Sequence, residues 1–178
     1  MKFVLPCKEY EERAVQFNRE FIEHSSRMYG NGGLSWHLEN ESYDDWLVKV
    51  QKDLDIANVA EGRVPAFTYF YVDEGDGRIV GVINIRLALD EFLRKEGGHI
   101  GYSIRPSERK KGHGTRMLRG ALDFCGVIGL ESVIITCDKV NVASANMIKN
   151  CGGVLDAEFY SEKIGEVIQR YTIAGGSV

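Results

Sequence analysis

The sequence predicts an α/β protein of the mixed α+β kind, in which helices cover the faces of a mixed β-sheet. Three observations lead to this prediction. Apolar residues recur at helical spacing between residues 8 and 54. Strand-like apolar and β-branched runs begin at residue 66. Between residues 99 and 150, strand-like and helix-like segments alternate, which favours a parallel or splayed strand pair within the sheet.

The N-terminal part is predicted to contain a short strand and two helices. Residues 2–5 (KFVL) form the strand, and a helix over residues 8–26 would place on one face Tyr10, Ala14, Phe17, Phe21 and Ile22. Glycines then interrupt the chain near residue 30. Ser42 is a plausible N-cap for the second helix, because acidic residues occupy the first turn that follows it. The apolar face of that helix would be Tyr43, Trp46, Leu47, Val50 and Leu54.

The remaining elements follow from strand runs, turn residues and one further periodic segment. Residues 66–72 and 78–89 should pair across the hairpin-type turn DEGDG. The run 132–138 (SVIITCD) is nearly all apolar, as expected of a buried central strand. The other expected elements are a loop over 90–98, a strand over 99–104, a helix over 116–125, a helix over 143–150, and a final hairpin of 153–162 with 167–174. We expect all 178 residues to form one domain.

Composition and charge argue against several classes of protein. The net charge of −4 and the pI near 5.6 argue against a general nucleic-acid binder. No apolar run approaches the length of a membrane span, and the N-terminus becomes charged too early for a secretory signal. The four cysteines lack CxxC spacing, and the four histidines are scattered. We therefore expect a cytoplasmic protein with free thiols and no metal.

A turn made of glycine and positive charge, RKKGHGT (residues 109–115), precedes the helix expected over 116–125. A helix start presents backbone N–H groups and a partial positive charge, and glycine lets a ligand approach that backbone closely. These properties favour a phosphate or pyrophosphate site, although a solvated basic turn explains the letters equally well. A nucleotide-triphosphate loop would need lysine after Gly114, and a dinucleotide fingerprint would need glycine at Met117.

The pattern Arg109-x-x-Gly112-x-Gly114 resembles the Arg/Gln-x-x-Gly-x-Gly/Ala signature of the GNAT superfamily of acyl-CoA-dependent N-acyltransferases. The context is similar too, because the signature follows an Ile-x-Pro sequence (residues 104–106), and a helix, a strand and Asn141 come after it. The resemblance covers nearly the whole chain. It implies a mostly antiparallel sheet with a central splayed parallel pair and helices on both faces. The implied reaction is transfer of an acetyl group from acetyl-CoA, the co-substrate, to a primary amine.

The resemblance also implies a set of residues that bind CoA. The backbone amides of Lys111, Gly112, His113, Gly114 and Thr115 would cradle the pyrophosphate, with the side chains of Arg109 and Lys111 beside it. The strand residues Ser103, Ile104 and Arg105 would bind the pantetheine arm through their backbone. Asn141 would bind the arm from the other side, supported by Ser144. An N-cap role for Asn141 is equally consistent with its position, and both roles are compatible.

The catalytic residues depart from the family pattern. Many members carry a tyrosine, the general acid, seven residues after the asparagine, and this chain has Ile148 there. Tyr102 and Tyr160 are candidate acids by residue type. An amine must be neutral to attack a thioester, and His99 is the candidate base on the strand before the signature. Glu91, Glu96 and a water chain are weaker candidates for the base. Because no cysteine has a recognisable His and Asp partner, direct transfer in a ternary complex is expected.

The acceptor is not specified by the sequence. It would bind over the N-terminal helices, residues 30–36 and the loop 90–98, as a small-molecule or peptide amine, with neither nucleic acid nor membrane as partner and with homodimerisation left open. Candidate lining residues are Trp36, His37, Trp46, Tyr69 and Tyr71, although core packing is the favoured explanation for the aromatic ones. A group of acids would either attract a cationic amine or complement the positive end of a helix: Glu39, Glu41, Asp44 and Asp45. A non-catalytic acyl-CoA-binding module and a nucleic-acid binder are the alternatives from other classes.

Overall fold

The computed structural model describes residues 1–33 and 41–174. The backbone forms two compact units: Met1–Ala88 with Tyr102–His113, and Leu89–Gly101 with Gly114–Val178. Each unit draws on segments that are far apart in the sequence. That the whole chain acts as one domain stays a prediction.

The first unit contains a sheet with the strand order β1-β2-β3-β4. Its strands are β1 (Lys2–Val4), β2 (Ala66–Val72), β3 (Ile79–Arg86) and β4 (Ile100–Ile104), whose first two residues belong to the second unit. β1 pairs with β2, and β2 with β3, in antiparallel fashion. The hairpin predicted around DEGDG is confirmed, because β2 and β3 flank this turn in register. The expected strand over 78–89 ends three residues early, at Arg86.

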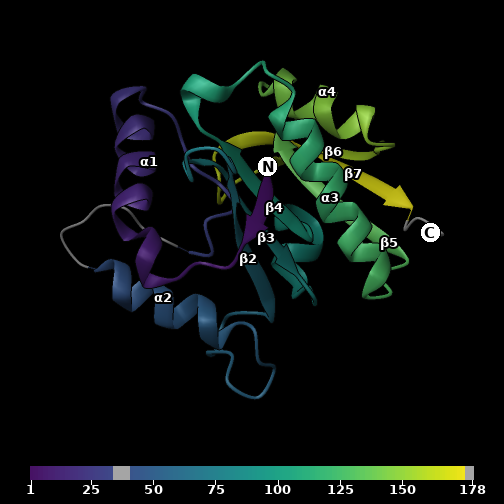
Figure 1. Ribbon diagram of the computed structural model, residues 1–178. Helices are drawn as coiled ribbons and strands as arrows, with labels where there is room; N and C mark the ends of the chain where they lie inside the picture. The colour runs from purple at the N-terminus through teal and green to yellow at the C-terminus, as the bar shows by residue number, and fades with distance from the viewer. Residues whose placement is uncertain (34–40, 175–178) are drawn as a thin grey trace. The chain divides into compact units, whose positions relative to one another are not determined.

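The helices of the first unit are α1 (Glu11–Glu23), preceded by a 3₁₀ turn at Lys8–Tyr10, and α2 (Tyr43–Lys52) (Figure 1). Their apolar faces share one core with β2 and β3: Ala14, Phe17, Phe21, Tyr43, Trp46, Val50, Phe70, Val72, Ile79 and Val82. The prediction for Ile22 was wrong, since its side chain is 59% exposed. The buried stripe of α1 follows residues 14, 17 and 21, and Ile22 lies one residue beyond it.

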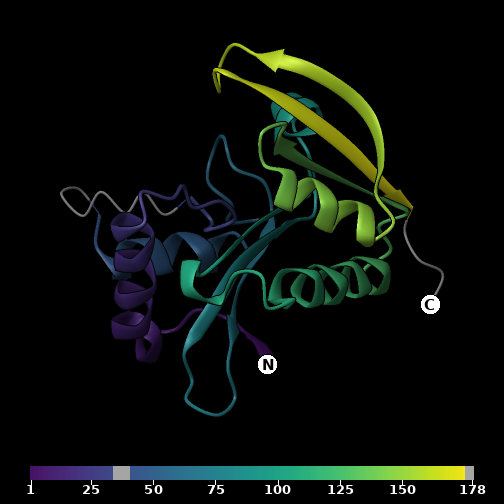
Figure 2. The ribbon, with the colours of Figure 1, turned by 90° about the horizontal axis from the view of Figure 1, so that it is seen from above.

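The second unit contains α3 (His113–Val127), whose first residue belongs to the first unit, α4 (Val142–Asn150), and a sheet with the strand order β5-β7-β6. β5 (Ser132–Asp138) and β6 (Val154–Ser161) both pair antiparallel with β7 (Glu166–Ala174). Figure 2 shows the β6–β7 hairpin in the yellow end of the colour range. β5 is therefore a terminal strand of its sheet, not a central one, and its edge away from β7 takes a backbone hydrogen bond from His99.

The mixed α/β architecture with antiparallel sheets is confirmed, and β4 and β5 belong to separate sheets. The loop expected over 90–98 contains a single π-helical turn, Leu93–Gly97. All four cysteines are free thiols, as expected. Within residues 1–33 and 41–174, no helix is both long and apolar enough to cross a membrane. The same residues include no group of three or more His, Cys, Asp or Glu side chains placed to hold a metal.

Candidate functional site

The glycine-rich turn connects β4 to α3, as the sequence predicts. A 3₁₀ turn at Pro106–Glu108 ends β4, and α3 begins at His113. Gly112 has a φ of 78°, in the left-handed region that glycine adopts without steric cost. Since α3 starts one residue later, the N–H groups of its first turn point out of the helix end without an acceptor inside the helix. A helix N-terminus of this kind is able to bind an anion.

A buried carboxylate that the sequence analysis did not single out organises this turn. Glu108 is 5% exposed, and its Oε1 lies 2.9 Å from Arg78 Nη2. Its Oε2 accepts a hydrogen bond of 3.0 Å from Lys111 Nζ and lies 3.5 Å from His113 Nε2. Burial alone would raise the pKa of Glu108, but the Lys111 hydrogen bond and the charges of Arg78 and Lys111 lower it below the usual value. The signal for this role was a single acid directly before the basic run RKKGHGT.

The neighbouring arginines are also held by protein groups. Arg109 donates from Nε to the carbonyl of Ile104 at 3.1 Å and from Nη2 to Ser26 Oγ at 2.7 Å. Its guanidinium lies 5.4 Å from the ring centroid of Phe21. Arg105 is buried, with its guanidinium over the ring of Phe17. The side chains of Arg109 and Lys111, expected beside the pyrophosphate, thus serve first to shape the turn.

The backbone of β4 offers hydrogen-bonding groups on one edge. The N–H of Arg105 donates to the carbonyl of Val80 at 2.8 Å and is therefore engaged with β3. Backbone groups alternate sides along a strand, so those of Tyr102 and Ile104 point to the opposite edge. β4 is the last strand of its sheet, so that edge carries no further strand of this sheet. The buried Ser103 uses its side chain to accept the N–H of Tyr29 at 2.7 Å.

In the second unit, Asn141 is the N-cap of α4. Its Oδ1 accepts the N–H of Ser144 at 3.1 Å, so the capping role that the sequence left open is present. This bond uses the carbonyl oxygen of the side chain and leaves its NH₂ group as a donor. Ile148 is fully buried in the same helix, at the position where many family members carry tyrosine. The family's usual acid is thus replaced by a core residue.

His99 bridges to β5 through both its backbone and its ring. Its N–H donates to the carbonyl of Ile134 at 2.7 Å, and its Nδ1 accepts the N–H of Ile134 at 2.9 Å. An Nδ1 that accepts carries no proton, so in the neutral ring the proton is on Nε2. A base role for His99 therefore requires Nδ1 to release the Ile134 N–H, because Nε2 already carries a proton. Gly98 allows the close approach, since a Cβ there would lie 2.6 Å from the Ile134 carbonyl oxygen.

The other candidate acids and bases differ in their surroundings. Tyr102 is partly buried on β4, and Tyr160 is 62% exposed on β6. Glu96 accepts a hydrogen bond of 2.6 Å from Ser161 Oγ, and Thr136 Oγ1 donates to its backbone carbonyl. Glu91 is exposed. Tyr102 remains the candidate acid because it lies on the strand that would face the pantetheine arm.

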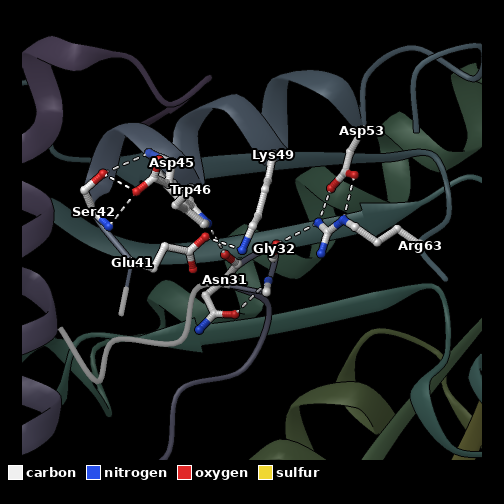
Figure 3. Close-up of polar contacts among 10 residues, drawn as sticks. Asn31, Gly32, Glu41, Ser42, Asp45, Trp46, Lys49, Asp53 and Arg63 are labelled. Carbon is white, nitrogen blue, oxygen red and sulfur yellow. Dashed lines mark hydrogen bonds and ion pairs between the residues drawn. The ribbon is translucent and has the colours of Figure 1, made fainter. Parts of the chain in front are cut away.

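Figure 3 shows a polar cluster in the first unit that fixes the chain after α1. Arg63 forms a bidentate pair with Asp53, which is 1% exposed, and donates to the carbonyl of Gly32 at 2.8 Å. Trp46 donates from its indole nitrogen to the carbonyl of Asn31 at 2.8 Å. Gly32 has a φ of 67°, and a Cβ there would lie 2.7 Å from Thr68 and from Val50. The backbone at residues 31–32 is therefore packed too closely for any side chain at Gly32.

The structure shows where most of the candidate residues for lining the acceptor site lie. Trp46 and Tyr71 are buried in the core, which agrees with core packing as the favoured explanation for the aromatic residues. Tyr69 is partly buried. Asp45 forms a capping box with Ser42, which confirms that N-cap, while Glu41 pairs with Lys49 and Asp44 pairs with Lys8. Trp36, His37 and Glu39 lie outside the described residues. The acids that the structure describes are thus explained by local pairing.

Glu108→Gln is expected to destabilise the protein by about 1–3 kcal/mol at pH 7, because it removes the buried charge that Arg78 and Lys111 face. A carboxylate with a lowered pKa stabilises the fold above its unfolded pKa, near 4.3, and this contribution is lost as the pH falls through the folded pKa. The difference in unfolding free energy between wild type and variant should therefore narrow as the pH falls below about 4.3. Urea unfolding at pH 7 and at pH 3.5 measures it, and an equal gap at both values would contradict this role for Glu108.

Comparison with known proteins points to one family. A family model described as "Acetyltransferase (GNAT) domain" matches residues 10–154. The curated Rattus norvegicus protein "N-acetyltransferase family 8 member 3" is 25% identical over 95 residues, which are 53% of this chain and 42% of that protein. The chain thus spans less than half the length of this curated relative.

Solved structures match over nearly the whole chain. A ribosomal-protein-S5-alanine acetyltransferase from Vibrio fischeri superposes with a TM-score of 0.70 at 16% identity, covering 98% of this chain and 93% of that one. An acetyltransferase from Salmonella typhimurium, solved with its cofactor acetyl-CoA, gives a TM-score of 0.66 at 12% identity, with coverages of 99% and 95%. At these identities the likeness concerns the fold.

Proposed function

Because the chain belongs to the GNAT acetyltransferase family, we propose that it transfers an acetyl group from acetyl-CoA to a primary amine of an acceptor. The observation that carries the proposal is the glycine-containing turn 109–112 leading directly into the N-terminus of α3. The amine attacks the thioester carbonyl directly, within a ternary complex. The thiolate of CoA is the leaving group, and the amine loses one proton.

The residues of the turn fit a CoA pyrophosphate. Gly112 and Gly114 carry no side chain at the α3 start, so the N–H groups of residues 111–115 can approach an anion closely. Arg109 and Lys111 add positive potential near this point, although their side chains also bind Ser26 and Glu108. The α3 dipole and the N–H groups would hold the phosphates, and bound acetyl-CoA would supply the thioester.

The pantetheine arm would lie along the outward edge of β4. The N–H of Arg105, expected to bind the arm, donates to Val80 instead. In this proposal the N–H of Ile104 binds the arm, and Ser103 positions that strand by accepting the N–H of Tyr29. The NH₂ group of Asn141 donates to the arm, while Ser144 keeps the Asn141 side chain in place. Backbone N–H groups at the β4 edge would polarise the thioester oxygen as negative charge develops on it.

Proton transfer is assigned to Tyr102 as acid and to His99 or solvent as base. The two roles of His99 can be separated by substitution. His99→Asn keeps an acceptor near the Ile134 N–H but removes the imidazole, whereas His99→Ala removes both. We expect His99→Ala to destabilise the protein by about 1–2 kcal/mol and His99→Asn by less. Only the alanine variant leaves the Ile134 N–H without an acceptor. Thermal unfolding of both variants measures this.

The catalytic activity of the same two variants shows whether His99 is the general base. If His99 is the base, kcat of His99→Asn falls by about 10²-fold or more while its stability stays near that of wild type. If solvent takes the proton, His99→Asn retains kcat within a few-fold. Equal destabilisation by Asn and Ala would contradict the assigned Nδ1 hydrogen bond.

A second function has one specific observation in its favour. Ile148 is buried where many relatives have their acid, which suits a module that binds acyl-CoA without turnover. A panel of amines tests both functions: spermidine, an aminoglycoside, a peptide with N-terminal alanine and a lysine-containing peptide with a blocked N-terminus, each with acetyl-CoA and thiol detection. Thiol release with one acceptor establishes transfer, and tight acetyl-CoA binding without release from the panel favours the binding module. We place the enzyme in the cytoplasm, consistent with its four free thiols.

A further inference from the structure

A carboxylate of α1 reaches the corner at which β4 passes into the glycine-rich turn. Glu20 Oε1 accepts the backbone N–H of Ser107 at 2.6 Å, and its Oε2 lies 3.6 Å from Arg105 Nε. These two residues flank Pro106, the first residue of the 3₁₀ turn that ends β4. One side chain of α1 therefore contacts the chain on both sides of the proline.

The guanidinium of Arg105 is buried beside Glu20. The Arg105 side chain is 7% exposed, and its Nε has no hydrogen-bond partner among the residues that the structure describes. Burial lowers the pKa of Arg105, and the charge of Glu20 opposes that effect more than any other acid does. A separation of 3.6 Å is too long for a charge-assisted hydrogen bond, so electrostatic attraction alone joins this pair.

The close contact of Glu20 is therefore the one with the backbone of the corner. Burial of Glu20 would raise the pKa of its carboxyl, but the hydrogen bond from Ser107 and the charge of Arg105 lower it below the usual value. The Ser107 N–H lies in the first residues of a 3₁₀ turn, where the turn itself offers no acceptor. Glu20 thus supplies an acceptor that the local backbone cannot.

This corner lies between the two parts of the proposed CoA site. The N–H of Ile104, which would bind the pantetheine arm, directly precedes the corner, and the N–H groups that would bind the pyrophosphate begin at Lys111. The turn also reaches back to the strand, because Arg109 Nε donates to the carbonyl of Ile104 at 3.1 Å. Since residues 105–110 join the two parts, a change of backbone direction at Pro106 would move one part relative to the other.

We propose that Glu20 is a positioning residue: by accepting the Ser107 N–H it fixes the corner after β4, and with it the placement of the pantetheine arm relative to the pyrophosphate. The inference rests on the proposed function and deepens it. A ligand that spans both parts gains its full affinity only when their spacing matches its own, whereas a ligand confined to one part is insensitive to that spacing. Acetyl-CoA would span both parts. Its nucleotide half, adenosine 3′-phosphate 5′-diphosphate, would occupy only the pyrophosphate part.

Two substitutions separate the hydrogen bond of Glu20 from its charge. Glu20→Ala removes both, whereas Glu20→Gln removes the charge but keeps an oxygen that can accept the Ser107 N–H. In titration calorimetry, Glu20→Ala should bind acetyl-CoA about 10-fold more weakly than wild type, the effect of one lost hydrogen bond. It should bind the nucleotide half within about twofold of wild type, because that ligand does not depend on the spacing. Glu20→Gln should bind both ligands within about threefold of wild type.

Thermal unfolding of the same variants measures the structural part of the role. Both variants remove the acid that faces the buried Arg105, so both should lower the melting temperature, by roughly 2–8 °C. A merely structural role would make acetyl-CoA affinity follow the melting temperature, whereas Glu20→Gln should lose stability and keep its affinity. Glu23→Ala, at an exposed position at the end of the same helix, is the matched control and should leave both quantities near wild type.

Wild-type affinity for acetyl-CoA in folded Glu20→Ala, or equal losses for acetyl-CoA and its nucleotide half, would overturn the inference and leave the proposed function intact. A Glu20→Gln variant that binds acetyl-CoA as weakly as Glu20→Ala would also overturn it, because the hydrogen bond to Ser107 would then not position the arm. A wild-type protein that binds neither ligand would overturn the proposed function and this inference together.

Discussion

Gly114→Val is expected to reduce the affinity for acetyl-CoA by about 10²-fold or more while leaving the fold largely intact. Gly114 is the second residue of α3, at the helix end that would hold the pyrophosphate. A β-branched side chain there would occupy the space through which the phosphate reaches the N–H groups. Valine has a helix propensity slightly higher than that of glycine, so the melting temperature should change by no more than a few degrees. Titration calorimetry and thermal unfolding of the same sample measure both quantities.

Gly114→Ala is the matched control, because the family signature accepts alanine at this position. A single methyl group should change acetyl-CoA affinity by only a few-fold. A Gly114→Val variant that binds acetyl-CoA as tightly as wild type would show that the anion site lies elsewhere. If Gly114→Ala lost as much affinity as Gly114→Val, with both folded, the graded steric explanation would be wrong.

Asp53→Asn is expected to destabilise the protein by about 2–4 kcal/mol, a fall in melting temperature of roughly 5–12 °C. Asp53 is 1% exposed, and its carboxylate accepts two hydrogen bonds from the Arg63 guanidinium. Asparagine keeps the shape but leaves the guanidinium without a counter-charge, and Arg63 also holds the Gly32 carbonyl (Figure 3). The loss of stability should therefore extend to the segment that follows α1. Thermal unfolding and hydrogen exchange at residues 31–33 measure the two effects.

Asp44→Asn provides the comparison for an exposed pair. Asp44 lies 2.7 Å from Lys8, with both side chains more than half exposed. Solvent screens such a pair, so the melting temperature should stay within about 2 °C of wild type. Equal losses in Asp44→Asn and Asp53→Asn would contradict the importance given to burial of the Asp53–Arg63 pair.

Much of this fold follows from local patterns in the sequence. The DEGDG turn, the N-caps Ser42 and Asn141, and the strand runs 66–72 and 132–138 each depend on neighbouring residues, and each is found where it was expected. Ile22 was misplaced because the periodicity of α1 is compatible with two adjacent stripes, and tertiary packing selects one. The terminal position of β5 depends on β7, more than 25 residues later, and no local pattern encodes it.

For the candidate site too, local features could be predicted from the sequence and long-range contacts could not. The position of the glycine turn before α3 could be predicted, because signature and helix start are contiguous in the sequence. The partners of its side chains could not. Glu108 meets Arg78 from the start of β3, and Arg109 meets Ser26 beyond the end of α1. Arg63 likewise donates to Asp53 and to the Gly32 carbonyl, and the spacing of these three residues in the sequence gives no sign of contact.

The most direct test of the account is thermal unfolding of the wild-type protein with acetyl-CoA, CoA, ATP or NAD, each in excess. A ligand at about 100 times its dissociation constant stabilises the native state by ~2.7 kcal/mol, or roughly 5–10 °C for a chain of this size. The account predicts such a shift with acetyl-CoA and CoA, and little change with ATP or NAD. No shift with acetyl-CoA at millimolar concentration, or an equal shift with ATP, would contradict the claim that the turn before α3 is a CoA site.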